Sequence, residues 1–337
     1  MGFPKPWPTQ WPEPADYPEI PLDPDNFPPA EQPTREDDYE YGDVDPLPEY
    51  RKSFYAVTWA INHACNLKCT HCYDVVGYHR HDLSTEQALL LIDRLHEAGV
   101  TFIAFSGGEA FLRKDLLTLM AHTAQKGMAF GARSNGTRIT PQMAGRLRNL
   151  GISVVGVSFD GATPQTHDAV RGAGAFEEAL AGLKALRAAG IRAQMEVVLS
   201  RQNAHEALDF VRLGEAVGAS EVNFSTMALR GRAQTRSQDA LDYPLWLDLT
   251  RALHAASRQA SIPVTPNCAL TGLCVVNIEP HVTCDGWMTP CYLSDQKLFN
   301  VLDMSGEQIR AHLAASRPQF LNICGREAWM KRPMLAV

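Results

Sequence analysis

The chain of 337 residues is longer than one average domain and has room for a barrel-type domain with a smaller appendage. Its net charge of −7 is uneven, because residues 1–50 carry 13 acidic residues against Lys5 and Arg35 and the remainder is slightly basic. That remainder has no basic block with interleaved aromatic residues, which argues against nucleic-acid binding. With no signal sequence and no apolar run of membrane-spanning length, we expect a cytoplasmic protein that binds no membrane.

Residues 1–50 form the first distinct segment. They contain 13 of the 22 prolines, which exclude a regular helix or a central strand. We expect an acidic, extended arm that is disordered or polyproline-like. The alternative is a lid or a strap bridging a dimer, anchored by the aromatic residues Trp7, Trp11, Tyr17, Phe27, Tyr39 and Tyr41.

From Phe54 onward, short β-rich apolar runs alternate with amphipathic helical patterns. The predicted strands are 55–60, 102–106, 129–134, 153–159, 193–199 and 221–226, and the helices between them are 85–98, 115–126, 141–150, 175–189 and 205–217. Six βα repeats predict an α/β fold in which a parallel sheet with right-handed crossovers curls into a partial (β/α)6 TIM-like barrel. The active site of such a barrel lies at the carboxyl ends of its strands.

Three cysteines follow the first predicted strand. Cys65, Cys69 and Cys72 have C-x3-C-x2-C spacing, and in a chain with eight cysteines and no secretory signal such a group indicates metal ligands. Three thiolates suit a [4Fe–4S] cluster with one iron open to a small molecule. The alternative is a zinc site completed by His63, His71 or His79.

Polar turns follow the next three strands. The second strand ends in Gly107-Gly108-Glu109, where paired glycines let the backbone approach a ligand and a carboxylate accepts from an ammonium group. The third ends in 134–137 (SNGT), the fourth in 158–161 (SFDG), and the loop after it carries 167–172 (HDAVRG). Each is ordinary turn chemistry alone, but their recurrence beside a three-cysteine loop indicates one site.

Together CNLKCTHC, GGE, SNGT, SFDG and HDAVRG resemble the radical S-adenosylmethionine (SAM) superfamily over roughly residues 53–230. The resemblance implies that SAM chelates the open iron. Electron transfer then cleaves it to a 5′-deoxyadenosyl radical that removes a hydrogen atom from a substrate. It also implies a flavodoxin or ferredoxin as reductant. Ala110 departs from the family, which usually has proline after GGE.

The resemblance also implies roles for individual residues. Cys65, Cys69 and Cys72 would hold the iron, and His71 would lie near adenine. Glu109, with the backbone of Gly107 and Gly108, would receive the methionine ammonium. Ser134 and Asn135 would lie near the ribose or methionine part, with Ser158, Asp160 and Arg171 as further SAM-binding candidates.

A second cysteine set follows a helical connector near 243–261. Residues 282–291 are predicted to form two strand halves around an Asp-Gly turn, with Cys291 just past the second. This hairpin resembles the twitch or SPASM extension, which binds auxiliary iron–sulfur clusters. It implies one auxiliary [4Fe–4S] cluster on Cys268, Cys274, Cys291 and Cys324; the alternative is buried thiols. The predicted domains are 1–50 (arm), 51–235 (barrel), 236–265 (connector) and 266–337 (α+β auxiliary-cluster domain).

Cys284 is left over from both predicted clusters. We expect a buried thiol there, with replacement of a cluster ligand or hydrogen-atom donation to a product radical as alternatives. Tyr73 and Tyr292 are further candidate donors.

The segment 65–232 is similar in texture to radical SAM enzymes that modify tetrapyrrole side chains, which favours a small-molecule substrate in cofactor or natural-product biosynthesis. A sugar or aminoglycoside dehydrogenase or epimerase is the main alternative. A peptide maturase is a third, disfavoured by the proline-rich arm in place of a leader-binding domain. A non-catalytic iron–sulfur or zinc protein is the alternative outside enzymes, distinguished by its inability to cleave SAM.

Overall fold

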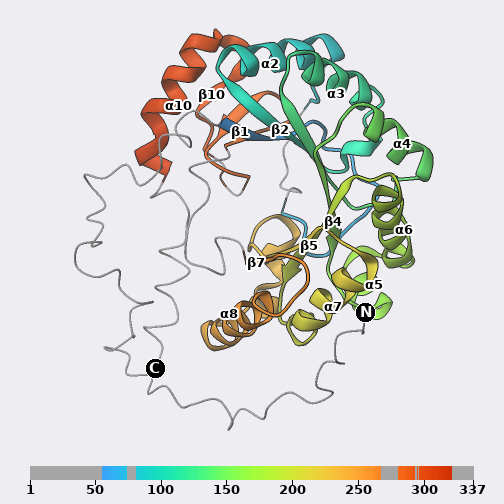
Figure 1. The fold of residues 1–337 in the computed structure, drawn as a ribbon. Coiled ribbons are helices and arrows are strands. Elements are labelled where there is room, and N and C mark those ends of the chain that lie inside the picture. Colours follow the sequence, from blue (N-terminus) through green and yellow to red (C-terminus); the bar gives the residue numbers. More distant parts are fainter. Residues whose placement is uncertain (1–54, 74–80, 267–279, 293, 295, 321–337) are drawn as a thin grey trace. The chain divides into compact units, whose positions relative to one another are not determined.

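The computed structural model describes residues 55–73, 81–266, 280–292, 294 and 296–320. Its centre is a parallel sheet in which β1 (Tyr55–Ala60), β2 (Val100–Ser106), β3 (Ala129–Ser134), β4 (Val154–Phe159), β5 (Arg192–Leu199) and β6 (Glu221–Thr226) are neighbours in chain order. The α/β partial barrel is therefore confirmed, with strand bounds within two residues of those predicted. Figure 1 shows the strands curving with helices on their outer side.

The helices between these strands are α2 (Thr85–Glu97), α3 (Leu116–Gln125), α4 (Pro141–Asn149), α5 (Pro164–Arg171), α6 (Ala175–Ala188) and α7 (Ala207–Val217). Their starts follow local chemistry. Ser84 and Gln87 form a capping box at α2, and Thr140 caps α4 with Pro141 in its first turn. Short 3₁₀ turns occupy Ala110–Leu112, Ala204–Glu206, Gly231–Thr235, Ser237–Asp239 and Val301–Asp303.

The helix α5 corrects the sequence prediction, which placed residues 167–172 in a loop. Thr163 accepts a hydrogen bond from the Thr166 amide, Pro164 stands in the first turn, and Gly172 ends the helix with a φ of 113°. This Thr-Pro start was present in the sequence and predicts a short helix. The correction matters because α5 presents His167 and Arg171 from one rigid element.

The sheet extends beyond the six predicted strands. The strand β7 (Val264–Pro266) pairs parallel to β6 and follows α8 (Tyr243–Ser257), while β8 (His281–Val282) pairs parallel to β1. The strands β8 and β9 (Trp287–Thr289) form the predicted hairpin, and β10 (Phe299–Asn300) pairs with β9. The hairpin therefore continues the barrel sheet. Beyond it, α10 (Gly306–Phe320) packs beside α2, where Arg310 donates to the Ala98 carbonyl.

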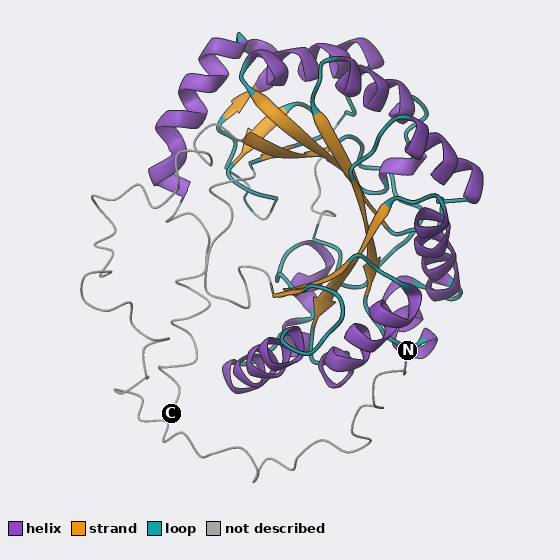
Figure 2. Ribbon diagram, in the orientation of Figure 1, coloured by secondary structure: helices purple, strands orange, loops and turns teal. Residues whose placement is uncertain are grey.

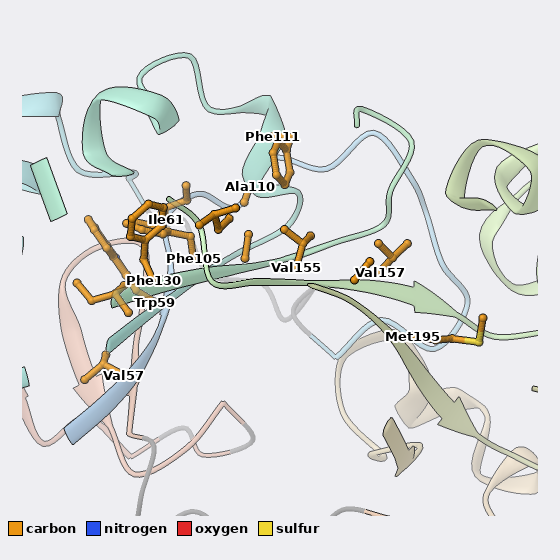
Figure 3. Close-up of a cluster of buried hydrophobic side chains, with 14 of the residues drawn as sticks. Val57, Trp59, Ile61, Phe105, Ala110, Phe111, Phe130, Val155, Val157 and Met195 are labelled. Atoms are coloured by element: carbon orange, nitrogen blue, oxygen red, sulfur yellow. The ribbon is translucent and has the colours of Figure 1, made fainter. Parts of the chain in front are cut away.

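The core lies between the sheet and the outer helices (Figures 2 and 3). Trp59, Phe105 and Phe130 come from three adjacent strands. The ring centroids of Trp59 and Phe105 are 6.0 Å apart, and those of Phe105 and Phe130 are 6.3 Å apart. Such burial of large apolar side chains is the main stabilising term of the fold. In the described part of the chain, no helix has the length and apolarity needed to cross a membrane. The predicted arm, residues 1–50, lies outside the described residues.

Candidate functional site

The cysteine loop leaves the carboxyl end of β1, as predicted. Cys65 is exposed, Cys72 is half-buried and Cys69 is 9% exposed. Burial raises the pKa of Cys69, the positive charge of Arg171 opposes this shift, and Asp160, Cys72 and Cys65 add to it. Three sulfur donors on one short loop fit a [4Fe–4S] cluster with one iron lacking a protein ligand.

The Gly107-Gly108-Glu109 turn fastens the start of this loop. The amide of Gly108 donates to the Asn62 carbonyl at 2.9 Å, and the amide of Glu109 donates to the Ala64 carbonyl at 2.8 Å. A Cβ on Gly108 would lie 2.5 Å from the carbonyl oxygens of His63 and Ala64. These glycines were predicted to let the backbone approach a ligand; in the structure they let it approach the chain that leads into Cys65.

The Glu109 carboxylate joins the end of β2 to the end of β3. It accepts from the Ser134 hydroxyl at 2.8 Å, the Asn135 amide at 2.8 Å and the Phe111 amide at 3.1 Å, and the residue is 1% exposed. Burial raises the pKa of Glu109, although these three donors and Arg171 oppose the shift. The role of Glu109 toward the methionine ammonium stays a prediction. Its contacts with Ser134 and Asn135 give the carboxylate a structural role as well, because they link the turns after β2 and β3.

The turn after β3 reaches the cysteine loop through a polar chain. The Asn135 side chain donates to the Asn66 side chain at 3.0 Å and has its nitrogen 4.0 Å from the sulfur of Cys65. Asn66 in turn donates to the Thr137 hydroxyl at 2.9 Å. Asn135, predicted near the ribose or methionine part, therefore lies beside the first cysteine, whereas Ser134 contacts the Glu109 carboxylate. Asn66 and Thr137 were missed, although both stand inside the quoted motifs.

A buried charged group lies beside the second cysteine. Asp160 is 1% exposed; its Oδ2 lies 2.5 Å from Nε of Arg171, and its Oδ1 lies 3.1 Å from Nε2 of His71. Burial alone raises the pKa of Asp160, but Arg171 and His71 outweigh it and hold that pKa below its usual range. The Val170 carbonyl accepts from the Thr70 amide at 2.9 Å. His71, Asp160 and Arg171, all predicted to bind SAM, thus form one network that joins the cysteine loop to the turn after β4 and to α5.

The segment after β6 holds the end of the loop. Arg232 donates its amide to the Cys72 carbonyl at 2.9 Å and its guanidinium to the Cys69 carbonyl at 3.0 Å. A Cβ on Gly231 would lie 2.3 Å from the Cys72 carbonyl oxygen. Arg232 ends the span 65–232 that carries the resemblance to tetrapyrrole-modifying enzymes, and no role was predicted for it. The sequence signal that could have pointed to Arg232 is the position of this segment after a barrel strand, because functional residues of such a barrel lie there.

The remaining predicted residues lie at the end of β4, in the hairpin region and outside the described residues. Ser158 is half-buried at the end of β4, and a small hollow lined by Thr70, His71, Asp160, Ser200, Asn203 and Met227, among others, opens nearby. Cys291 and Cys284 are buried in the hairpin region. The rings of Tyr73 and Tyr292, which follow Cys72 and Cys291, have centroids 5.4 Å apart. Cys268, Cys274 and Cys324 lie outside the described residues, so the auxiliary cluster stays a prediction.

Comparison with known proteins agrees with this geometry. Residues 59–214 match the model of the radical SAM superfamily. Over 216 residues the chain is 31% identical to an AdoMet-dependent heme synthase of Nitratidesulfovibrio vulgaris, covering 63% of this chain and 59% of that protein. It is 37% identical over 166 residues to the mycofactocin maturase MftC of Mycobacterium ulcerans, covering 49% and 45%. The chain thus spans about half to three fifths of the length of these relatives.

A solved structure shows the same fold. The chain aligns with native anSMEcpe with bound AdoMet at a TM-score of 0.62 and 17% identity, covering 82% of this chain and 83% of that one. The fold of this chain is therefore that of a known architecture.

Proposed function

Because residues 59–214 match the radical SAM superfamily, we propose that this chain is a radical SAM enzyme acting on a tetrapyrrole side chain. The observation that carries the first part is the anchoring of one three-cysteine loop by the ends of β2, β3, β4 and β6. Cys65, Cys69 and Cys72 would hold the cluster. When bound, it supplies the electron that cleaves SAM to methionine and a 5′-deoxyadenosyl radical.

The protein residues prepare this site by fixing its shape. Glu109 holds Asn135 in place, so the carbonyl and amide groups near Cys65 keep their positions. We assign the methionine part of SAM to this side of the loop and its adenine to the side that carries His71 and Asp160. Rigid dipoles of this kind need no reorganisation when charge moves.

The substrate class rests on the relatives. The heme synthase matches 63% of this chain, which favours a porphyrin that carries carboxylate side chains. Peptide modification is the second candidate, because the aligned part of MftC is 37% identical. An auxiliary cluster that includes Cys291 would accept an electron or bind the substrate, and a flavodoxin or ferredoxin would supply the reducing electron.

The test has two stages. Anaerobically reconstituted protein and a variant with Cys65, Cys69 and Cys72 all changed to Ala are compared for iron, sulfide and dithionite-driven 5′-deoxyadenosine. We expect 5′-deoxyadenosine from the parent alone, and about four fewer irons in the variant. Cleavage by the variant would refute the site.

The second stage adds iron porphyrins with propionate side chains, or peptides, to the active parent. We expect porphyrin-dependent 5′-deoxyadenosine and a product lighter by a side-chain carboxyl group. A mass change in a peptide alone would move the assignment to the second candidate, and turnover of neither class would remove the tetrapyrrole proposal while leaving SAM cleavage intact.

A further inference from the structure

A second group of metal-ligand side chains lies at the edge of the cysteine loop. His63, Asp82 and Cys284 each offer one ligand atom, and these atoms all lie within 4.8 Å of one another. The three residues come from the loop after β1, the segment before α2 and the turn between β8 and β9. None of them belongs to either predicted cluster.

The backbone brings these three segments together. The strand β8 pairs with β1 in parallel, so the residues that follow both strands emerge at the same edge of the sheet. The amide of Leu83 donates to the Cys284 carbonyl at 3.0 Å, and the amide of His63 donates to Oδ1 of Asp82 at 3.0 Å. One main-chain contact therefore holds the segment before α2 against the β8–β9 turn, and the Asp82 carboxylate accepts from the main chain at His63.

The donor atoms select a class of cation. An imidazole nitrogen, a thiolate and a carboxylate oxygen suit a borderline divalent ion such as Zn²⁺, whereas Mg²⁺ and Ca²⁺ prefer oxygen alone. Cys284 is 2% exposed, while the side chains of His63 and Asp82 are 59% and 31% exposed. The group thus has a buried sulfur on one side and solvent on the other.

We propose that His63, Asp82 and Cys284 form a mononuclear Zn²⁺ site whose fourth position is open to water or to a carboxylate. Nδ1 of His63 lies 2.7 Å from Oδ1 of Asp82, so in the absence of a cation the two side chains are linked by a hydrogen bond. Binding replaces this bond with two bonds to the metal and releases the thiol proton of Cys284 to solvent. The bound ion ties the β8–β9 turn to the chain two residues before Cys65. This proposal is independent of the substrate assigned above.

The test is the zinc and iron content of the full chain. Parent protein and the variants His63→Gln, Asp82→Asn and Cys284→Ala are incubated anaerobically with one equivalent of Zn²⁺ after cluster reconstitution, then desalted and measured by elemental mass spectrometry. We expect about one zinc per chain in the parent and at least a fivefold loss in His63→Gln and Cys284→Ala, with the same iron content throughout. His81→Gln is the matched control, since His81 is exposed, adjacent to Asp82 and outside the group.

Three results would overturn the proposal: a parent without retained zinc, equal zinc in the parent and all three variants, or loss of iron together with zinc in Cys284→Ala, which would make Cys284 a cluster ligand. His63→Gln keeps the test valid if the buried substitution at Cys284 impairs folding, because His63 is largely exposed.

Discussion

Nε of Arg171 lies 2.5 Å from Oδ2 of Asp160, and the two side chains are 9% and 1% exposed. The pair connects the end of α5 to the turn after β4, beside Cys69. Because both side chains are buried, water solvates neither the guanidinium nor the carboxylate well, and each charge depends on its partner. We interpret Arg171 as a positioning residue whose charge also acts on the cysteine loop.

Arg171→Met should therefore destabilise the protein strongly. Removing the guanidinium leaves the buried Asp160 carboxylate with His71 as its remaining partner, and breaking a buried ion pair in this way costs about 3–5 kcal/mol of unfolding free energy. Urea denaturation of the cluster-free protein measures this loss without the cluster. Asp160→Asn combined with Arg171→Met should recover part of it; a double variant less stable than Arg171→Met would contradict the pairing argument.

The buried His167 should give the protein a pH-dependent stability. Burial lowers the pKa of His167 to about 4, assisted by Arg171, and the side chain is 0% exposed. Since the unfolded state has the ordinary value of about 6.5, it binds more protons than the folded state between these values. Stability is therefore complete above about pH 6.5 and falls as the pH drops toward 4.

His167→Gln tests this expectation because it removes the titration while keeping a polar group next to the Asp160 amide. Across pH 6.5 to 4, the parent should lose up to about 1.4 kcal/mol per pH unit more than the variant. Chemical denaturation at several pH values gives both slopes. Equal slopes would show that His167 does not protonate on unfolding in this range.

Glu109→Gln should weaken SAM cleavage without removing iron. The carboxylate accepts three hydrogen bonds, and an amide in its place presents a donor toward at least one existing donor, Asn135 or Ser134. We expect at least a tenfold lower rate of 5′-deoxyadenosine formation, with unchanged iron content. Ser134→Ala removes one of these bonds, at a cost of about 1 kcal/mol, and should have the smaller effect. The reverse order would refute the assigned role of the carboxylate.

Much of this arrangement was predictable from the sequence. The alternation of apolar runs and amphipathic helices gave the order of β1 to β6, because that pattern reports burial directly. The residue types in the strand-end turns predicted one shared site, and the structure brings Glu109, Ser134 and Asn135 into mutual contact. The reason for the paired glycines was not predictable, since Gly107 and Gly108 are required by main-chain contacts with residues 62–64, far away in sequence.

Two other features depended on tertiary contact. The parallel pairing of β8 with β1 involves only two residue pairs, Thr58 with His281 and Trp59 with Val282, and no local pattern specifies it. The hydrogen bond from the Arg232 guanidinium to the Cys69 carbonyl joins residues that are 163 positions apart in the sequence. A single sequence reveals the residue types that suit such contacts but contains no information on which distant segments meet.

Gly108→Ala should prevent the turn after β2 from closing on the cysteine loop. The added Cβ would lie 2.5 Å from the carbonyl oxygens of His63 and Ala64, and the Ala64 oxygen is itself held by the hydrogen bond from the Glu109 amide. We expect lower thermal stability and incomplete iron loading. Gly145→Ala in α4 is the control, because its Cβ meets nothing within 4 Å and alanine should add about 0.5–1 kcal/mol there. Full iron loading in Gly108→Ala would show that this contact is dispensable.

The contact between Tyr73 and Tyr292 predicts an energetic coupling between the two cysteine regions. Their centroids are 5.4 Å apart with an interplanar angle of 55°, a geometry favourable for aromatic rings. Each tyrosine directly follows a predicted cluster cysteine, so the pair fixes the end of the first loop against the start of the segment after β9. A double-mutant cycle of Tyr73→Leu and Tyr292→Leu should give a coupling of about 0.5–1.5 kcal/mol in unfolding free energy. Additive losses would mean that the rings pack independently, whereas coupling would make the hairpin a support of the loop that carries Cys72.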